Sequence, residues 1–296
     1  MNHPEQDQHK IPQVYLKQFG YVNASKQWKV SVMERGGTFT RQKNIKSFTA
    51  VTNVFDIDSD DPIIRRIFEK LNGDLENGYH HIIADLDTES RLSDKSYAFL
   101  LQLIANLIIR SDYWRNLTLG LLNGPGRARF LQFITGHHCK DEAEYKAIDQ
   151  QPFYKVLNES SPKDALNRAM LYFMDHLMLR LWHYEIVIIR SQDDKEWWTS
   201  TNPVVVHNQM KGLEIFTKES EFYFPISPTY LAYLHCKGSD DQINPLRSLM
   251  TNQIYVATDA QNTALQQLIL ENPSDCTIIA GEFNYRKGNE VPLSFH

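Results

Sequence analysis

The feature that most constrains the fold is a change of hydrophobic period near residue 185. Between residues 61 and 184 the apolar side chains recur every three or four positions, which is the spacing of an amphipathic helix. After that point the chain changes to short runs of β-branched and aromatic residues, such as residues 186–189 and 230–234, separated by turn-forming residues. A helical middle followed by short strands predicts an α+β fold.

The helical middle carries its own start and stop signals. An Asp-Pro pair at residues 61–62 is typical of a helix N-terminus, because aspartate caps the first turn and proline fits its first position. Glycine and proline at residues 124–126 end the second predicted helix. These signals, with the apolar spacing, predict helices from residue 61 onward and at residues 93–122, 128–135, 141–149, 162–184, 245–258 and 259–271.

A β-hairpin is expected ahead of the helical middle. Residues 28–32 alternate in polarity, and glycines at 36–37 supply the turn before residues 38–40. We expect a central helical bundle packed on a mixed or antiparallel sheet, built from this hairpin and the C-terminal strands. The chain is then a single domain over residues 1–296, consisting of an N-terminal hairpin (20–58), a helical middle (61–184) and a β-rich part (185–296).

Composition limits the compartment and the partners. A net charge of -5 and a pI near 6.1 argue against a surface that is basic throughout, although a local basic patch would not show in this sum. Cys139, Cys236 and Cys276 are too far apart for a disulfide framework or a zinc motif, so reduced thiols in a cytoplasm are expected. The opening residues lack the apolar core of a secretory signal, and the apolar stretch 100–109 is too short to cross a membrane.

Four separate segments each place a proline or an arginine at fixed spacing from polar and aromatic residues. They are the run His-x-x-Pro-x-x-Tyr-Leu-x-x-Phe from residue 9, a helix end with Arg110 and Arg115, the turn Thr-Ser-Thr-Asn-Pro from residue 199, and Phe-Pro-Ile-Ser-Pro from residue 224. Together these segments resemble the family called domain of unknown function 4238, over about residues 9–260.

The chain departs from the family pattern at three positions. Ser111 and Asp112 stand where the pattern has Thr-Pro, and Thr201 stands where it has Asp. These substitutions leave Arg110, Arg115, Ser200, Asn202 and Pro203 in step with the pattern. The resemblance implies which residues matter and supplies no mechanism, so each candidate is considered for its own chemistry.

Two glutamates on the first long helix are candidate catalytic residues. Glu69 and Glu76, together with His80, are expected on the face opposite the apolar stripe. The resemblance implies glutamates at both positions in family members. Two carboxylates can transfer protons or bind a cation, so a divalent metal is a candidate cofactor. The alternative interpretation is a solvated helix face.

Arg110 and Arg115 are candidate substrate-binding residues at the end of an apolar helix. Guanidinium groups bind phosphate and carboxylate in bidentate geometry, which predicts an anion clamp. Arg110 is also spaced to stack on Trp114. The alternative is that the two arginines interact with the helix C-terminus or pair with buried acids.

The opening run and the turn at residue 199 supply the remaining candidates. His9 is a candidate general acid or base because an imidazole titrates near neutral pH, and Tyr15 of the same run is a candidate substrate-binding residue. Ser200 and Asn202 would orient a polar group of a substrate, or would only join two strands. A His-His-Cys run at residues 137–139 is interpreted as an exposed connection rather than a metal loop.

Two hypotheses from different classes follow. The first is a hydrolase-like or nuclease-like enzyme acting on a phosphate-bearing substrate, either a nucleotide or a nucleic acid, with a toxin or phage-defence effector as its biological context. The second is a non-catalytic binding or interaction module in which the same polar residues form a structural network. A site requires these side chains to line one accessible cleft, whereas a network requires them to be buried in mutual pairs.

Overall fold

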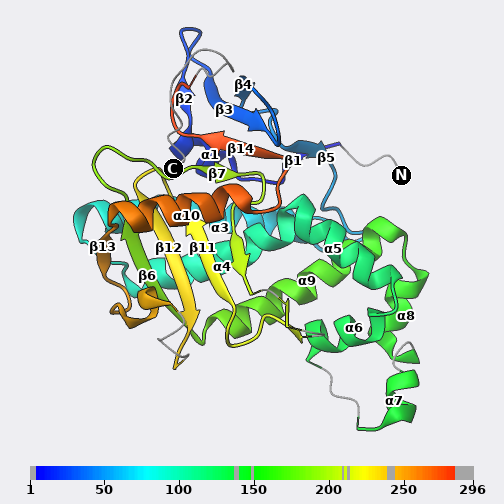
Figure 1. The fold of residues 1–296 in the computed structure, drawn as a ribbon. Helices are drawn as coiled ribbons and strands as arrows, with labels where there is room; N and C mark the ends of the chain where they lie inside the picture. The colour runs from blue at the N-terminus through cyan, green and yellow to red at the C-terminus, as the bar shows by residue number, and fades with distance from the viewer. Residues whose placement is uncertain are drawn as a thin grey trace.

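The computed structural model describes residues 5–136, 140–147, 150–208, 210–211, 214–238 and 244–283. The protein has an α+β fold in which a helical bundle packs on one face of a mixed sheet, with a second sheet beside it (Figure 1). The His-His-Cys run at residues 137–139 lies outside the described residues. In the part that the structure describes, no helix has both the length and the apolar character needed to cross a membrane.

Helices dominate the middle of the chain, and strands precede and follow them. The described helices are α1 Gln13–Phe19, α2 Pro62–Arg65, α3 Ile67–Thr88, α4 Asp94–Arg110, α5 Asp112–Asn123, α6 Arg127–Thr135, α7 Glu142–Lys146, α8 Pro152–Glu159, α9 Pro162–Leu181, the 3-10 helix η2 Pro245–Ser248, and α10 Asp259–Glu271. The described strands are β1 Asp7–His9, β2 Tyr21–Val22, β3 Trp28–Glu34, β4 Thr40–Asn44, β5 Ala50–Thr52, β6 Tyr184–Arg190, β7 Thr199–Ser200, β8 Val205–His207, β9 Met210–Lys211, β10 Glu214–Ile215, β11 Glu221–Pro225, β12 Tyr230–Cys236, β13 Ile254–Val256 and β14 Cys276–Ile279.

Two of the predicted helices are each broken once. The helix that starts at Pro62 stops at Arg66, so a short α2 precedes the long α3. The helix predicted to continue to Leu122 stops at Arg110, because Ser111 is extended and its hydroxyl accepts a hydrogen bond from the Trp114 N–H at 3.5 Å. Ser111 therefore ends α4 and caps α5. The break leaves Arg110 at a helix C-terminus.

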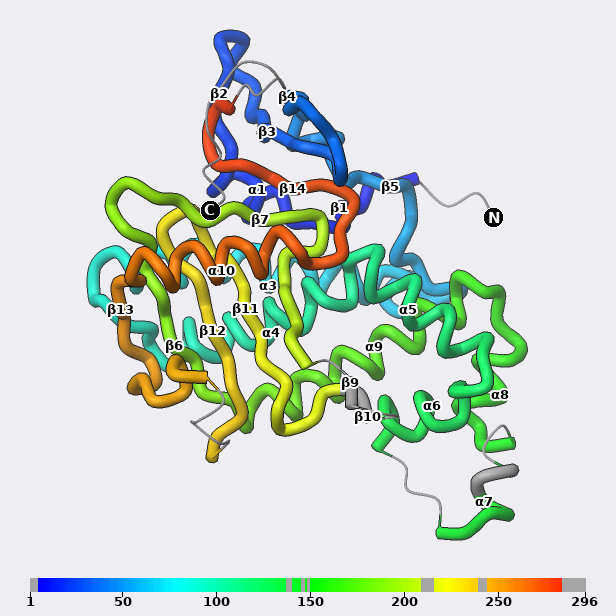
Figure 2. The backbone as a smooth tube through the Cα atoms, in the orientation of Figure 1, coloured from blue at the N-terminus to red at the C-terminus, as the bar shows by residue number. Residues whose placement is uncertain are grey.

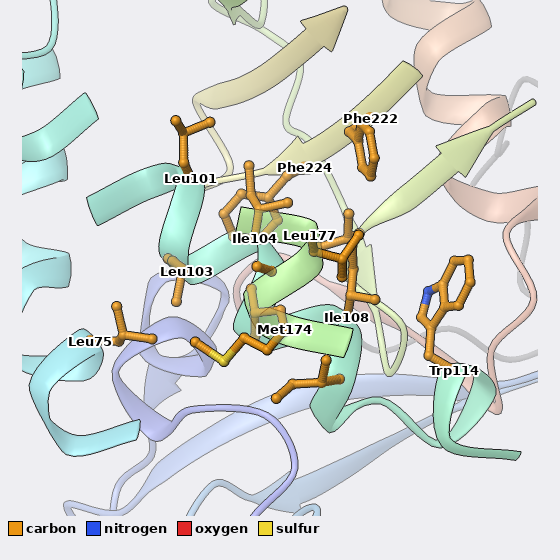
Figure 3. Close-up of a cluster of buried hydrophobic side chains, with 14 of the residues drawn as sticks. Leu75, Leu101, Leu103, Ile104, Ile108, Trp114, Met174, Leu177, Phe222 and Phe224 are labelled. Carbon is orange, nitrogen blue, oxygen red and sulfur yellow. The ribbon is translucent and has the colours of Figure 1, made fainter. Parts of the chain in front are cut away.

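The central helix of the bundle is α4, which packs against α3 and α9. Every residue from 103 to 110 is buried, which explains the apolar character of this segment. Gly78 lets α3 approach α4 closely, since an added Cβ would lie 2.6 Å from the ring of Phe99. Leu101 and Ile104 of α4 and Phe224 of β11 belong to one cluster of buried apolar side chains (Figure 3). Each aliphatic side chain fully buried in this core contributes about 1.5 to 3 kcal/mol.

The mixed sheet, described over five strands, has the order β13-β6-β12-β11-β8. All neighbours are antiparallel except β13, which is parallel to β6. Ile186 and Phe222 face the helical bundle, whereas Val187 and Tyr223 face α10 on the other side. The tube in Figure 2 shows α10 crossing the strands on that side.

One helix predicted in this region is wrong. Residues 245–258 contain the single 3-10 turn η2, followed by the strand β13 rather than by more helix. Ile254 pairs with Ile188 of β6, so tertiary pairing overrides the local sequence preference.

The second sheet joins the two ends of the chain. In the described residues its strands run β2-β3-β14-β7, with β4 also paired to β3. Val32 of the N-terminal hairpin pairs with Ile278 near the C-terminus, which confirms that the hairpin and C-terminal strands share a sheet. Gly20 is required where α1 meets β3, because a Cβ there would lie 2.7 Å from the Lys29 carbonyl oxygen. The hairpin and the C-terminal strands, predicted to form a single sheet, are therefore divided mainly between two five-stranded sheets. In the described residues, β1 with β5 and β9 with β10 form separate two-stranded sheets.

Candidate functional site

A buried arginine forms the centre of the strongest polar cluster among the predicted residues. Arg110 is only 1% exposed. Its Nε donates to the His9 carbonyl oxygen at 3.1 Å, and one terminal nitrogen donates to Glu76 Oε1 and to Asn106 Oδ1, each at 3.2 Å. The other terminal nitrogen also bonds to the His9 carbonyl and lies 3.3 Å from Glu76. Burial lowers the pKa of Arg110, and the Glu76 carboxylate opposes that shift. The guanidinium therefore directs its donors into the protein.

The two candidate glutamates lie next to this arginine. The Glu76 side chain is 30% exposed. Glu69, about two helical turns before it, is half-buried. Burial raises the pKa of the Glu69 carboxyl, and the nearby Glu76 raises it further, while Arg110 and Arg66 oppose the shift. The prediction that both glutamates lie opposite the apolar stripe is wrong, because Glu76 lies one turn after the buried Asn72 and flanks the stripe.

The exposed His80 does not join this cluster. Across the described ranges, no group of three or more His, Cys, Asp or Glu side chains is arranged to hold a metal ion. The Glu69 and Glu76 carboxyl groups lie near the Arg110 guanidinium, and Glu76 forms an ion pair with it.

The opening segment is held to the cluster mainly through its backbone. The carbonyl of His9 accepts from Arg110, whereas its imidazole Nε2 donates to the Lys46 carbonyl oxygen at 2.8 Å. Lys10 forms an ion pair with Asp112 at 2.6 Å, just after the end of α4. The half-buried imidazole thus contacts the loop after β4, while the main chain contacts α4.

Arg115 lies close to Arg110 but does not form a clamp with it. Both guanidinium groups lie against the ring of Phe55, Arg110 at 5.8 Å and Arg115 at 5.1 Å from its centroid. The expected stacking of Arg110 on Trp114 is therefore replaced by stacking on Phe55. One terminal nitrogen of Arg115 donates to Asn167 Oδ1 at 2.8 Å, and the other has no partner among the described residues. Burial lowers the pKa of Arg115 to about 10.

The segment around Phe55 is fixed by further buried amides. The Gln8 side chain accepts from the Phe55 N–H at 2.7 Å and donates to Asp56 at 2.7 Å. The Asn167 amide donates to the carbonyl oxygens of Val54 and Asp56 at 3.1 and 2.9 Å. These bonds satisfy the polar backbone of a loop buried against α9. Arg110 and Arg115 belong to this polar network.

Sequence reasoning missed the amide members of the network. Gln8 immediately precedes the family pattern, and Asn106 interrupts the apolar face of α4, where its amide donates to Asn72 at 2.9 Å. A polar residue inside an otherwise apolar helix segment signals a buried hydrogen bond, because an unpaired amide there would be costly. That signal was present at Asn106.

Tyr15 occupies a separate, closed position. Its side chain is fully buried, with the hydroxyl 2.6 Å from Thr199 Oγ1 and donating to the Pro225 carbonyl oxygen at 2.9 Å. Burial raises the pKa of Tyr15, and the hydrogen bond with Thr199 opposes that shift. The hydroxyl ties α1 to both sheets.

Ser200 and Asn202 build the turn after β7. The Ser200 hydroxyl donates to the Asn202 carbonyl oxygen at 2.8 Å and accepts from the Asn202 N–H at 3.1 Å. The Asn202 amide donates to the Pro273 carbonyl oxygen at 3.0 Å, and both residues are buried. Successive strand residues face opposite sides, so Ser200 points away from the side on which Thr199 meets Tyr15. The predicted residues thus fall into two groups, one around Arg110 and one around this turn.

A second buried Arg–Glu pair lies on the sheet face that α10 also covers. Glu221 accepts from Arg247 Nε at 2.8 Å, from the Tyr233 hydroxyl at 2.6 Å and from the Tyr223 hydroxyl at 2.9 Å. The Asn244 amide donates to both carboxylate oxygens. The sequence carried no sign of this cluster, because it depends on which strands lie side by side.

Comparison with known proteins identifies a family whose function is described as unknown. A family model described as "Protein of unknown function (DUF4238)" matches residues 7–266. No curated protein and no solved structure matches the chain. The match covers the opening run, the Arg110 cluster and the turn at Ser200.

Proposed function

The chain belongs to the DUF4238 family, and from that premise we propose that it is a non-catalytic binding module whose family-pattern residues build the fold. The polar residues that the family pattern marks would hold the opening segment, the loop around Phe55 and the turn after β7 in place. Binding would then occur on another surface. Buried polar networks can specify one packing arrangement without taking part in a reaction.

One observation carries this proposal. Arg110 is 1% exposed and makes hydrogen bonds to the His9 carbonyl, Glu76 and Asn106. An external phosphate would have to displace these partners and leave a buried carbonyl or amide unpaired, which is costly. Ser200 and Asn202 are also buried, and their side chains donate to the backbone carbonyl oxygens of Asn202 and Pro273. Polar side chains that are buried and hydrogen-bonded within the protein support a structural role.

The test compares a buried arginine with an exposed one. We expect Arg110→Gln to lower the free energy of unfolding by about 3 kcal/mol, because the change breaks a buried ion pair. Arg41→Gln is the matched control: Arg41 pairs with Glu34 at 3.0 Å, but the two side chains are 52% and 58% exposed. That change should cost about 0.5 kcal/mol or less. Chemical denaturation of both variants gives the comparison, and equal stabilities would reject the structural role.

A second candidate function rests on the glutamates. Glu69 is half-buried with a raised pKa, and the neighbouring Glu76 is partly exposed, so the pair could supply an acid and a base at an open edge. This favours an enzyme acting by proton transfer, with nucleotides or nucleic acids as the substrates to try first. It does not use Arg110 as a phosphate clamp.

This candidate is tested by a hydrolysis assay. Purified protein is incubated with a panel of nucleotides, RNA and DNA, and product release is measured for the parent, Glu69→Gln and Glu89→Gln. A catalytic pair predicts turnover that falls at least about 100-fold in Glu69→Gln. Glu89 is exposed at the end of α3 and serves as the control, with unchanged turnover. Activity that survives Glu69→Gln would remove Glu69 from the mechanism.

A further inference from the structure

An apolar groove lies between α2, the start of α3, α8 and α9. It has a volume of about 420 Å³. Ile57, Ile64, Phe153, Val156, Leu171 and Tyr172 line it together with two further apolar side chains and Arg168. Pockets of roughly 300 to 1,000 Å³ with mainly apolar walls are typical of small-molecule sites. None of the family-pattern residues lines this groove.

The walls of the groove leave apolar surface open to water. Ile64 and Val156 are each 43% exposed, and Tyr172 is 41% exposed. Phe153 and Tyr172 place their rings 4.1 Å apart, which forms an aromatic wall. Burying a contiguous, concave apolar surface under a ligand is favourable. Single exposed apolar residues, in contrast, are common on protein surfaces and need no explanation.

The charge in the groove is already balanced. Arg168 Nε forms an ion pair with Asp164 at 2.7 Å, and a terminal nitrogen donates to the Asp58 carbonyl oxygen at 3.1 Å. The Asp164 carboxylate is in turn held by the Asp58 N–H at 2.7 Å. A charged ligand would lose its hydration in the groove, and the neutral Arg168–Asp164 pair would not compensate that cost with an opposite net charge. The electrostatics therefore match an uncharged occupant.

We propose that this groove binds an uncharged, apolar small molecule, with an aromatic or branched hydrocarbon body lying against Phe153 and Tyr172. Its concave shape and volume match a small molecule, and its neutral ion pair matches a ligand without charge. This proposal rests on the binding role proposed above. It adds where the ligand binds, which the Arg110 network does not indicate.

The experiment uses the full chain and the uncharged fluorophore N-phenyl-1-naphthylamine. We expect saturable binding to a single site, seen as a rise in fluorescence. Val156→Lys and Ile64→Lys place a charge at the rim of the groove and should each weaken binding at least tenfold. Leu179→Lys is the matched control, because Leu179 is 68% exposed on α9 and does not line the groove. It should bind as the parent does.

The possible results distinguish a failure of the groove proposal from a failure of the structural role proposed for the family-pattern residues. Absence of saturable binding, or equal binding in Val156→Lys, Ile64→Lys and the parent, overturns the groove. If the groove fails while Arg110→Gln is strongly destabilised, the structural role of the family pattern stands and another surface must bind the ligand. If the groove binds while Arg110→Gln keeps its stability, the structural role fails and the groove stands. Circular dichroism of each variant confirms that it is folded.

Discussion

The two buried arginine–glutamate pairs differ in how completely the protein encloses the carboxylate. In the pair Arg110–Glu76 the arginine is 1% exposed and the glutamate 30% exposed, at 3.2 Å. In the pair Arg247–Glu221 the side chains are 1% and 3% exposed, at 2.8 Å. The first pair joins α3 to α4, whose Arg110 also holds the opening segment, and the second joins η2 to β11. We call them the open pair and the closed pair.

The difference shows how the same two residue types acquire different electrostatic behaviour. Burial alone would raise the pKa of Glu221, but hydrogen bonds from Tyr233, Arg247 and Tyr223 together bring it below the ordinary value. Beside the open pair, burial and the Glu76 charge raise the pKa of Glu69. Donors that converge on a carboxylate favour its charge, whereas burial next to a second carboxylate disfavours it.

The largest effect is expected at the closed pair. Glu221→Gln should lower the free energy of unfolding by about 4 kcal/mol, because it leaves the buried Arg247 charge without its partner. Glu76→Gln should cost only about 1 to 2 kcal/mol, since Arg110 keeps its bonds to the His9 carbonyl and Asn106. Urea denaturation of the two variants, done side by side, measures both values. Equal losses of unfolding free energy in the two variants would mean that burial of the carboxylate does not determine how much each pair stabilises the fold.

An intermediate effect is expected when the pH is lowered. His235 lies across from Glu221 in the sheet, is buried, and its ring nitrogens have no hydrogen-bond partner among the described residues. Burial lowers its pKa below 6.5, while Glu185 opposes the shift. The unfolded chain then binds the proton first, so stability falls as the pH drops below about 6.5.

The decrease in stability with falling pH can be tested with a variant that lacks the imidazole. His235→Gln cannot be protonated, so its melting temperature should change less than that of the parent between pH 7 and pH 5. Melting curves at half-unit steps over this range give the comparison. Parallel curves for the two proteins would show that protonation of His235 does not cause the loss of stability on acidification.

The smallest effect is expected at Glu69, beside the open pair, and its dependence on pH has the opposite sign. The pKa of Glu69 is raised above 4.5 in the folded protein, so the folded state holds the proton more tightly and loses stability as the pH rises through that raised pKa. Glu69→Gln removes this loss and should raise the melting temperature slightly at pH 7, with little change near pH 4. A lower melting temperature at pH 7 would show that the Glu69 charge stabilises the fold.

The sequence predicted those elements whose signals are local. The Asp61-Pro62 helix start, the helix at residues 259–271 and the paired hairpin strands β3 and β4 are where they were expected. The breaks at Arg66 and Ser111 were missed because the apolar spacing continues through both positions. Residues 254–256 form a strand only because β6 lies beside them.

The candidate site was predictable in part, because its members are far apart in the chain. The arginine and glutamate of the open pair are separated by 34 residues, and only the packing of α3 on α4 brings them together. Residue chemistry indicated Glu76 and Arg110 as candidates, and left open whether the arginine would face solvent or a buried acid. The closed pair depends on the packing that brings Arg247 of η2 to Glu221 of β11, 26 residues earlier in the chain, which no spacing in the sequence reveals.

The pairing of the N-terminal hairpin with β14 has a consequence for folding. The Ser31 hydroxyl donates to the Gly281 carbonyl oxygen across 250 residues of chain. Contacts of such long sequence separation form slowly, because a large loop must close before they add stability. A ribosome making this protein releases the hairpin long before its partner strand, because the helical middle lies between them in the chain. The helical bundle therefore has time to assemble while the exposed edge of β3 still lacks β14, and a chaperone that shields this edge should increase the yield of folded protein.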